Sequence, residues 1–112
     1  MNICLIRPPA LLKVFSFIMK PSPPLGLALI AGALKEAGHK VTVIDAIAEN
    51  PDQLIPWHKD IFLNGLTFDE LLEKIPRNTE LIGLNLMFTC NWLSDRKLID
   101  FIGEHLDRKS VV

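Results

Sequence analysis

The sequence contains no tyrosine, only two cysteines and no long hydrophobic run. Cys4 and Cys90 lie far apart and no C-x-x-C occurs, so the sequence predicts neither a disulfide framework nor a structural zinc site. The longest apolar stretch, Leu25–Leu34, is far shorter than the roughly 20 residues that a membrane span needs. The first residues also lack the basic start and long apolar core of a signal peptide. We therefore expect a cytoplasmic protein with two buried free thiols.

The balanced charge and the motifs that are missing argue against several further classes of protein and binding site. The 112 residues include 12 Lys or Arg and 13 Asp or Glu, without a basic patch interleaved with aromatics, so we do not expect a nucleic-acid partner. There is no G-x-G-x-x-G, no G-K-[ST], no acidic pair and no Ser/Thr-Gly phosphate loop after the first apolar run. These absences argue against an ordinary dinucleotide site, a P-loop, a receiver domain and a flavodoxin. No pair of nucleophile and base stands out, so we assign no catalytic residue.

The best-defined part of the chain runs from Pro21 to Ala46. Ser22 is a candidate N-cap, and a helix over Leu25–Ala37 follows a pair of prolines suited to a first helical turn. Gly38 stands where a helix ends in a left-handed residue, and Lys40–Asp45 then has the β-branched pattern of a strand. The helix is apolar nearly all round, which predicts that it is covered on more than one side.

The N-terminal and middle segments are interpreted as one strand and two long connections. Ile3–Ile6 is a continuous apolar run, typical of a strand buried on both faces. Ala10–Lys20 is an unusually apolar loop, expected either to hold a short helix or to cover a ligand. Ile47–Leu66 is broken by prolines and by an Asn-Gly turn, and is interpreted as a second connection.

The last third continues the alternation of helices and strands. Thr67–Ile75 is a predicted helix with a Thr-x-x-Glu capping box, and Leu81–Phe88 is a predicted third buried strand. Leu93–Leu106 is a predicted amphipathic helix, with Leu93, Leu98, Ile102 and Leu106 toward the core and Asp95, Arg96, Lys97 and Asp100 outside. Lys109–Val112 has the pattern of the first residues of a fourth strand.

This alternation predicts a single α/β domain over residues 1–112 with a parallel sheet and right-handed crossovers. Such sheets usually have five or more strands, so we interpret the chain as an incomplete, truncated domain. The third strand would then be an open, apolar edge at which a homodimer could form.

Ligands of open parallel sheets bind beyond the carboxyl ends of the strands. This rule points to Arg7–Pro9, Ser22–Gly26, Asp45-Ala46 and Met87–Trp92. Gly26 would let a ligand approach the helix start or would serve packing alone, whereas Gly32 is interpreted as a helix–sheet contact.

Several single residues at this edge have both a ligand-binding and a purely structural interpretation. Asp45 could bind a ribose hydroxyl or cap the next loop, and Trp92 could stack on a flat ring or bury itself at a helix start. Thr89, Cys90 and Asn91 place polar groups at a strand exit, where they serve either a ligand or a turn. The three histidines are scattered, and we expect no ligand role for them.

Three stretches together resemble the N-terminal cobalamin-binding domain of B12-dependent radical SAM proteins. They are ICLIRPP (Ile3–Pro9), PPLGLALIAGALKEAGHKVTVIDAIAE (Pro23–Glu49) and LIGLNLMFTCNW (Leu81–Trp92). In that family a proline pair ends the first strand, a P-P-L-G-L helix start follows, a G-H-x-V turn leads to a strand ending in Asp-Ala, and a third strand runs into a polar loop.

The resemblance implies a flavodoxin-like fold with strand order 2-1-3-4-5 and cobalamin across the carboxyl ends of the strands. The contacts carried over by position are Pro24, Leu25, Gly26, Asp45, Ala46, Met87, Phe88, Thr89, Cys90 and Asn91. The apolar loop Ala10–Lys20 would help to cover the ring.

The chain departs from the family in what it lacks. It contains no D-x-H-x-x-G, whose histidine ligates cobalt in methyltransferase-type domains, although this radical SAM family generally lacks that motif too. The fourth and fifth strands with their G-G-x-H-x-[TS] loop are missing, as is the C-x-x-x-C-x-x-C iron–sulfur motif. S-adenosylmethionine and the 4Fe-4S cluster would therefore belong to a downstream radical SAM domain.

The leading hypothesis is a cobalamin-binding module that positions the cofactor for methyl transfer or related radical chemistry elsewhere. One alternative is the N-terminal half of a two-domain glycosyltransferase, which shares the P-P-x-G helix and the G-H-x-V turn but usually has another early glycine. The other alternative is an α/β fragment that binds no ligand and associates with other domains.

Overall fold

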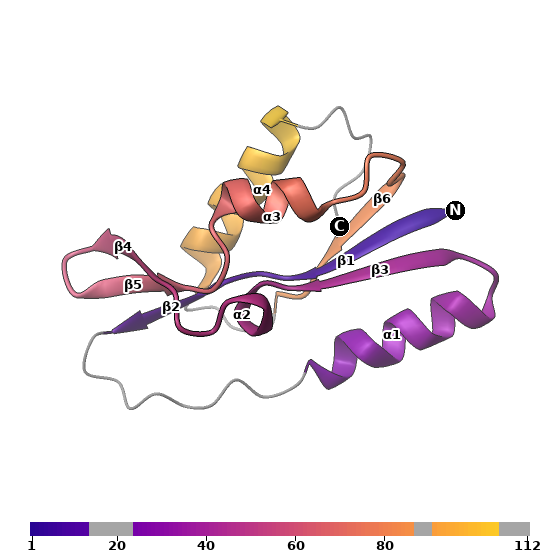
Figure 1. Cartoon of the computed structure of the whole chain (residues 1–112), viewed down its shortest axis with the longest axis horizontal. Helices are drawn as coiled ribbons and strands as arrows, with labels where there is room; N and C mark the ends of the chain where they lie inside the picture. Colours follow the sequence, from indigo (N-terminus) through magenta and orange to yellow (C-terminus); the bar gives the residue numbers. More distant parts are fainter. Residues whose placement is uncertain (14–23, 87–90, 106–112) are drawn as a thin grey trace.

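The computed structural model describes residues 1–13, 24–86 and 91–105 and shows a mixed α/β fold (Figure 1). A parallel sheet has the order β3-β1-β6 and a small antiparallel sheet has the order β2-β5-β4. The strands are β1 (Asn2–Arg7), β2 (Ala10–Lys13), β3 (Lys40–Asp45), β4 (Leu54–His58), β5 (Ile61–Asn64) and β6 (Leu81–Leu84). The helices are α1 (Leu25–Glu36), α2 (Ala46–Glu49), α3 (Phe68–Lys74) and α4 (Trp92–His105).

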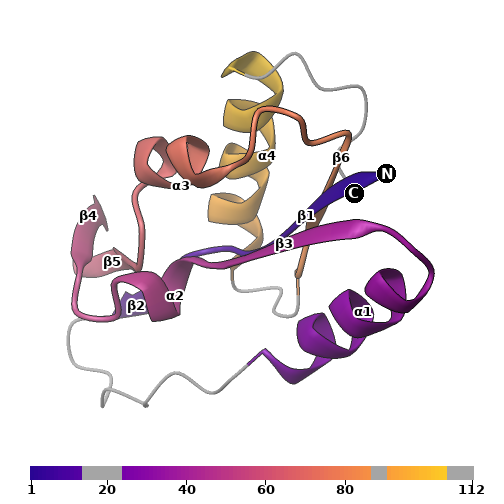
Figure 2. The ribbon, with the colours of Figure 1, turned by 45° about the vertical axis from the view of Figure 1, so that its right-hand side comes forward.

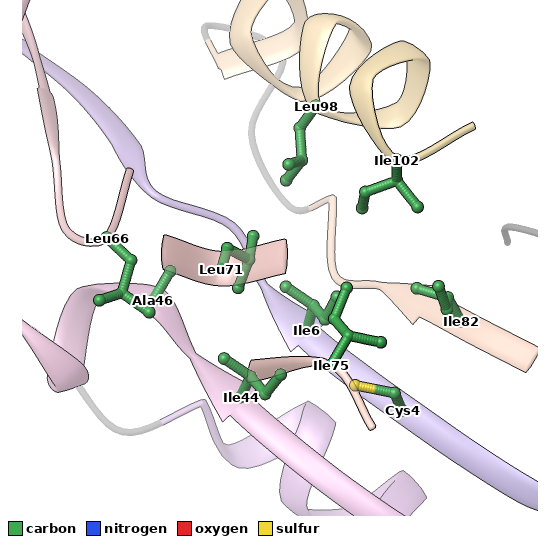
Figure 3. Close-up of a cluster of buried hydrophobic side chains, with 10 residues drawn as sticks. All are labelled: Cys4, Ile6, Ile44, Ala46, Leu66, Leu71, Ile75, Ile82, Leu98 and Ile102. Atoms are coloured by element: carbon green, nitrogen blue, oxygen red, sulfur yellow. The ribbon is translucent and has the colours of Figure 1, made fainter. Parts of the chain in front are cut away.

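Strand β1 lies in the middle of the parallel sheet and is buried on both faces, as its apolar run predicts. Its side chains alternate between two separate cores. One core lies between the sheet and α1 and contains Ile3, Leu5, Leu27 and Ala31. The other lies on the opposite face, under α3 and α4, and Figure 3 shows its members. They are Cys4, Ile6, Ile44, Ala46, Leu66, Leu71, Ile75, Ile82, Leu98 and Ile102.

Helix α1 covers one face of the sheet, and α3 and α4 lie on the other face (Figure 2). Leu27 and Ala31 of α1 face the sheet, whereas Leu25, Leu29 and Ile30 are 54 to 70% exposed. In the described part of the chain the sheet covers one side of α1 and the other side is exposed, so the second cover stays a prediction.

The ends of α1 differ in how well the sequence predicted them. Its N-cap is Pro24, which makes no side-chain capping bond, and Ser22 lies outside the described residues. Gly38 has the expected positive φ of 93° after the helix. Gly32 is exposed, and a Cβ there would meet nothing within 4 Å, so its interpretation as a close helix–sheet contact was wrong.

Helix α3 begins with the predicted capping box. The Thr67 hydroxyl accepts a hydrogen bond from the Glu70 N–H at 3.1 Å, and the Glu70 carboxylate accepts from the Thr67 N–H at 3.0 Å. Gln53 Nε2 also donates to Glu70 Oε1 at 2.8 Å, and this bond is the largest cause of a lowered Glu70 pKa. The network fastens α3 to the segment that precedes β4.

Helix α4 lies at a different rotation from the predicted one. Leu98 and Ile102 are buried as expected, but Leu93 is 66% exposed and Asp95 is 4% exposed. Positions five apart on a helix, such as Leu93 and Leu98, differ by about 140°, so they cannot share a face. Leu106 lies outside the described residues.

The antiparallel sheet replaces parts of both predicted connections. Strand β2 takes the first residues of the expected loop Ala10–Lys20, and β4 and β5 form a hairpin within Ile47–Leu66. Pro56 lies at an irregularity in the pairing of β4, which is an edge strand, where a missing N–H does little harm. The interpretation as irregular connections was wrong for Ala10–Lys13 and for the β4–β5 hairpin, whereas residues 14–20 lie outside the described part of the chain.

The predicted third parallel strand is shorter than expected, because β6 ends at Leu84. Within the described residues no strand pairs with its outer side. The expected fourth strand, Lys109–Val112, falls outside the described part of the chain. None of the helices that the structure describes is long and apolar enough to cross a bilayer.

Candidate functional site

The carboxyl ends of the parallel strands bring charged and amide side chains together. β1 ends at Arg7 and β3 ends at Asp45, and these two residues are register partners in the parallel pairing. Arg7 Nη1 lies 3.2 Å from Asp45 Oδ2, and both side chains are less than one-fifth exposed. Asn85 follows β6 directly, and its backbone N–H donates to the Ile6 carbonyl oxygen at 2.9 Å.

Asp45 also shapes the first turn after its strand. Its Oδ1 accepts hydrogen bonds from the N–H groups of Ile47 and Ala48, both at 3.1 Å, and so caps α2. Of the two interpretations of this residue, the cap is confirmed. One carboxylate therefore fixes both the turn and the position of Arg7 at the strand ends.

We expect Asp45→Ala to lower the free energy of unfolding by about 1.5–2 kcal/mol, because it removes a helix cap and a partly buried ion pair. Asp45→Asn keeps a capping oxygen but not the charge, so we expect it to lose less than half of that amount. Urea unfolding of both variants separates the contribution of the helix cap from that of the ion pair with Arg7. Equal losses in the two variants would contradict the capping role.

A cavity of about 110 Å³ opens beside the Arg7–Asp45 pair. Its apolar wall comes from the segment that follows β1 and from α2, and its polar wall comes from β1, from the residue after β6 and from the start of α4. The lining residues are Arg7, Pro8, Pro9, Ala10, Ile47, Asn85, Asn91 and Asp95. The cavity therefore lies where the rule for parallel sheets places a ligand.

Asn91 connects this cavity to the antiparallel sheet. Its Oδ1 accepts a hydrogen bond from the backbone N–H of Leu11 in β2 at 3.1 Å. Because a backbone N–H can only donate, this contact fixes the amide orientation and leaves Nδ2 as a donor at the cavity wall. The backbone oxygen of Asn91 accepts from the Ser94 hydroxyl at 2.9 Å, which holds the start of α4.

Of the two polar cavity residues that sequence reasoning missed, Asn85 and Asp95, Asp95 is the charged one. It lies in the first turn of α4, its side chain lines the cavity, and burial raises its pKa to about 6. Within the described residues its carboxylate takes part in no hydrogen bond or ion pair. Leu98 and Ile102 set the buried face of α4, and Asp95 lies three residues before Leu98 on that face. That spacing was the signal that could have found it.

The start of α1 does not line this cavity. Pro24 is half-buried, Leu25 is 70% exposed, and a Cβ on Gly26 would meet nothing within 4 Å. Packing within the described residues therefore gives no reason for a glycine at position 26.

The other sequence-predicted site residues divide into three groups. Ala46 is fully buried in the core under α3 and α4. Asn91 lines the cavity, and Trp92 is 48% exposed at the start of α4. Met87, Phe88, Thr89 and Cys90 lie outside the described residues.

Among the residues that the structure describes, this edge has neither an accessible cysteine nor a cluster of metal ligands. Cys4 is a free, fully buried thiol in the core, and burial raises its pKa to about 11. No three histidine, cysteine, aspartate or glutamate side chains gather as metal ligands in residues 1–13, 24–86 and 91–105.

Comparison of the chain with models of known protein families, with curated proteins and with solved structures gives no match in any of the three.

Proposed function

We propose that this chain is the cobalamin-binding module of a B12-dependent radical SAM enzyme, with a flavodoxin-like fold of which β3-β1-β6 forms the 2-1-3 part. The observation that carries the proposal is the edge at the carboxyl ends of these strands. There a polar cavity, the Arg7–Asp45 pair and the open backbone at Gly26 occur together with the sequence pattern of that family.

The residues at this edge would offer a corrin ring an exposed apolar surface and a small polar cavity for one of its peripheral groups. Leu25, Leu86 and Trp92 are 42 to 70% exposed, and such side chains provide an apolar surface for a broad ring. The cavity of about 110 Å³ is much too small to enclose a corrin, so the ring would lie across the edge and only a peripheral group would enter. Ligand sites commonly combine an apolar surface with a few polar groups in this way.

Bound cobalamin would supply methyl transfer or related radical chemistry in a parent enzyme whose radical SAM domain lies outside this chain. The chain's own residues would bind and orient the cofactor. Gly26 would let the ring approach the α1 backbone, and the Arg7–Asp45 pair would keep the ends of β1 and β3 in register beside it. Thr89, Cys90 and Asn91 would contribute contacts from the loop that follows β6.

Gly26→Val tests this assignment, because its side chain would occupy the space into which the ring is proposed to fit. We expect hydroxocobalamin to bind the polypeptide, extended past Val112 by its native sequence, and to bind Gly26→Val at least tenfold more weakly. The measurement is an absorbance titration. Gly32→Val is the matched control, since Gly32 is also exposed on α1 with nothing near its Cβ position.

Neither variant should lower stability, because valine is a better helix former than glycine and both sites have open space. Equal binding by both variants would remove Gly26 from the site. Absence of binding by the unsubstituted, extended polypeptide would refute the cobalamin assignment itself.

A further inference from the structure

The polar cavity contains a carboxylate whose burial the fold does not otherwise explain. Asp95 is 4% exposed, yet no described residue gives it a hydrogen bond or a cation. Arg7 lines the same cavity, but its ion pair is with Asp45. A buried charge without a partner costs free energy, and such residues are concentrated at binding and catalytic sites.

Two amide side chains face the same space. Asn91 Nδ2 remains a donor after its Oδ1 accepts from Leu11, and the Asn85 side chain makes no hydrogen bond within the described residues. The cavity thus offers an acceptor at Asp95 and donors at both asparagines. Because a 150 Å³ cavity binds benzene, about 110 Å³ holds a planar group of roughly four or five non-hydrogen atoms.

Charge and hydrogen-bonding capacity restrict the kind of group that can bind here. A ligand carboxylate would approach the Asp95 carboxylate, and like charges at close range repel. An ammonium group would face Arg7 and would leave the amide donors without an acceptor. A neutral primary carboxamide has both an NH₂ donor and a carbonyl acceptor in one plane, and it satisfies both sides of the cavity.

We propose that Asp95, Asn85 and Asn91 form a binding subsite for a primary carboxamide. Asp95 accepts from the ligand NH₂ group, and the asparagine side chains donate to the ligand carbonyl oxygen. Carboxamide side chains surround the corrin ring of cobalamin, and a free small amide offers the same chemistry. The assignment of the ligand to a corrin side chain rests on the proposed function, whereas the subsite itself does not.

Three small probes of similar size test the subsite on the chain itself: propionamide, propionate and propylamine. The readout is the backbone amide NMR spectrum at pH 7.5, where Asp95 is ionised. We expect propionamide alone to produce saturable shifts at Asn85, Asn91 and Asp95. Asp95→Asn should weaken propionamide binding at least tenfold, and Asn85→Ala, from a different segment, should weaken it several-fold. Asp100→Asn, on an exposed position of the same helix, is the matched control and should bind as the unsubstituted chain does.

Equal or tighter binding of propionate or propylamine would overturn the proposal, as would unchanged affinity in Asp95→Asn or the absence of any saturable shift with propionamide. A parallel hydroxocobalamin titration shows whether the carboxamide comes from a corrin side chain or from a free small amide. Binding of propionamide without cobalamin supports the subsite and refutes the corrin as its ligand. Binding of cobalamin without propionamide leaves the proposed function intact and overturns the subsite.

Discussion

Gly65→Ala should lower the free energy of unfolding by about 2–5 kcal/mol. Gly65 has a φ of 123°, and a Cβ at this position would lie 2.6 Å from the backbone oxygen of Ala46. The strained backbone costs about 1–2 kcal/mol and the overlap adds about 1–3 kcal/mol. The overlap cannot be relieved by a side-chain rotation, because that oxygen accepts the Leu66 N–H at 2.9 Å and belongs to the turn at the strand ends.

Substitutions at two other glycines separate the cost of backbone strain from the cost of the steric overlap. Gly38 has a φ of 93° with open space around its Cβ position, so Gly38→Ala should cost only the backbone term of about 1–2 kcal/mol. Gly103 lies in α4 with a free Cβ position, and Gly103→Ala should stabilise the chain by up to about 1 kcal/mol. Urea unfolding measures all three. A loss in Gly65→Ala no larger than in Gly38→Ala would show that the close approach to Ala46 is absent.

Asp95→Asn should stabilise the chain by about 2 kcal/mol at pH 7.5. Burial raises the pKa of Asp95 to about 6, and a shift of about two units corresponds to roughly 2–3 kcal/mol. The position of Asp95 in the first turn of α4 favours a negative charge by only about 0.3–1 kcal/mol, so desolvation is the larger effect. An asparagine of similar shape removes the charge and keeps the packing.

The pH dependence gives the same prediction an independent test. The raised pKa means that the folded state binds the Asp95 proton more tightly, so its stabilising contribution is complete below about pH 4 and is lost as pH rises through about 6. The stability difference between Asp95→Asn and the unsubstituted chain should therefore grow between about pH 4 and pH 7. Asp100→Asn should follow the unsubstituted chain. A constant difference would show that Asp95 is not buried as a charge.

The sequence predicted the parallel core because its local signals agree with the tertiary environment. The apolar run of β1 matches a strand covered on both faces, and the Thr67 capping box places α3 correctly. The hairpin β4–β5 was missed because Pro56 suggested a break, whereas the strand tolerates it at an edge irregularity. The turn at Lys59, with a φ of 50°, has none of the usual Asn-Gly or Asp-Gly signal.

The sequence predicted the place of the cavity better than the residues that line it. The rule for parallel sheets pointed to the residues after β1 and to Asn91, and these residues line the cavity. Asp95 was placed outside, because a charged residue near a helix start ordinarily faces solvent, and only the rotation of α4 shows otherwise. Asn85 was counted as part of a longer strand, whereas β6 ends one residue earlier.

The most direct test of the central claim locates bound cobalamin on the sheet. In the ¹⁵N spectrum of the polypeptide extended past Val112, hydroxocobalamin should shift the amides of Arg7, Asn85 and Asn91 at the carboxyl ends of the strands. The amides of Lys40 and Glu80, which bond to Met1 and Asn2 at the opposite ends, should stay in place. Shifts at Lys40 and Glu80, or no shifts at all, would contradict a cofactor site at the carboxyl edge.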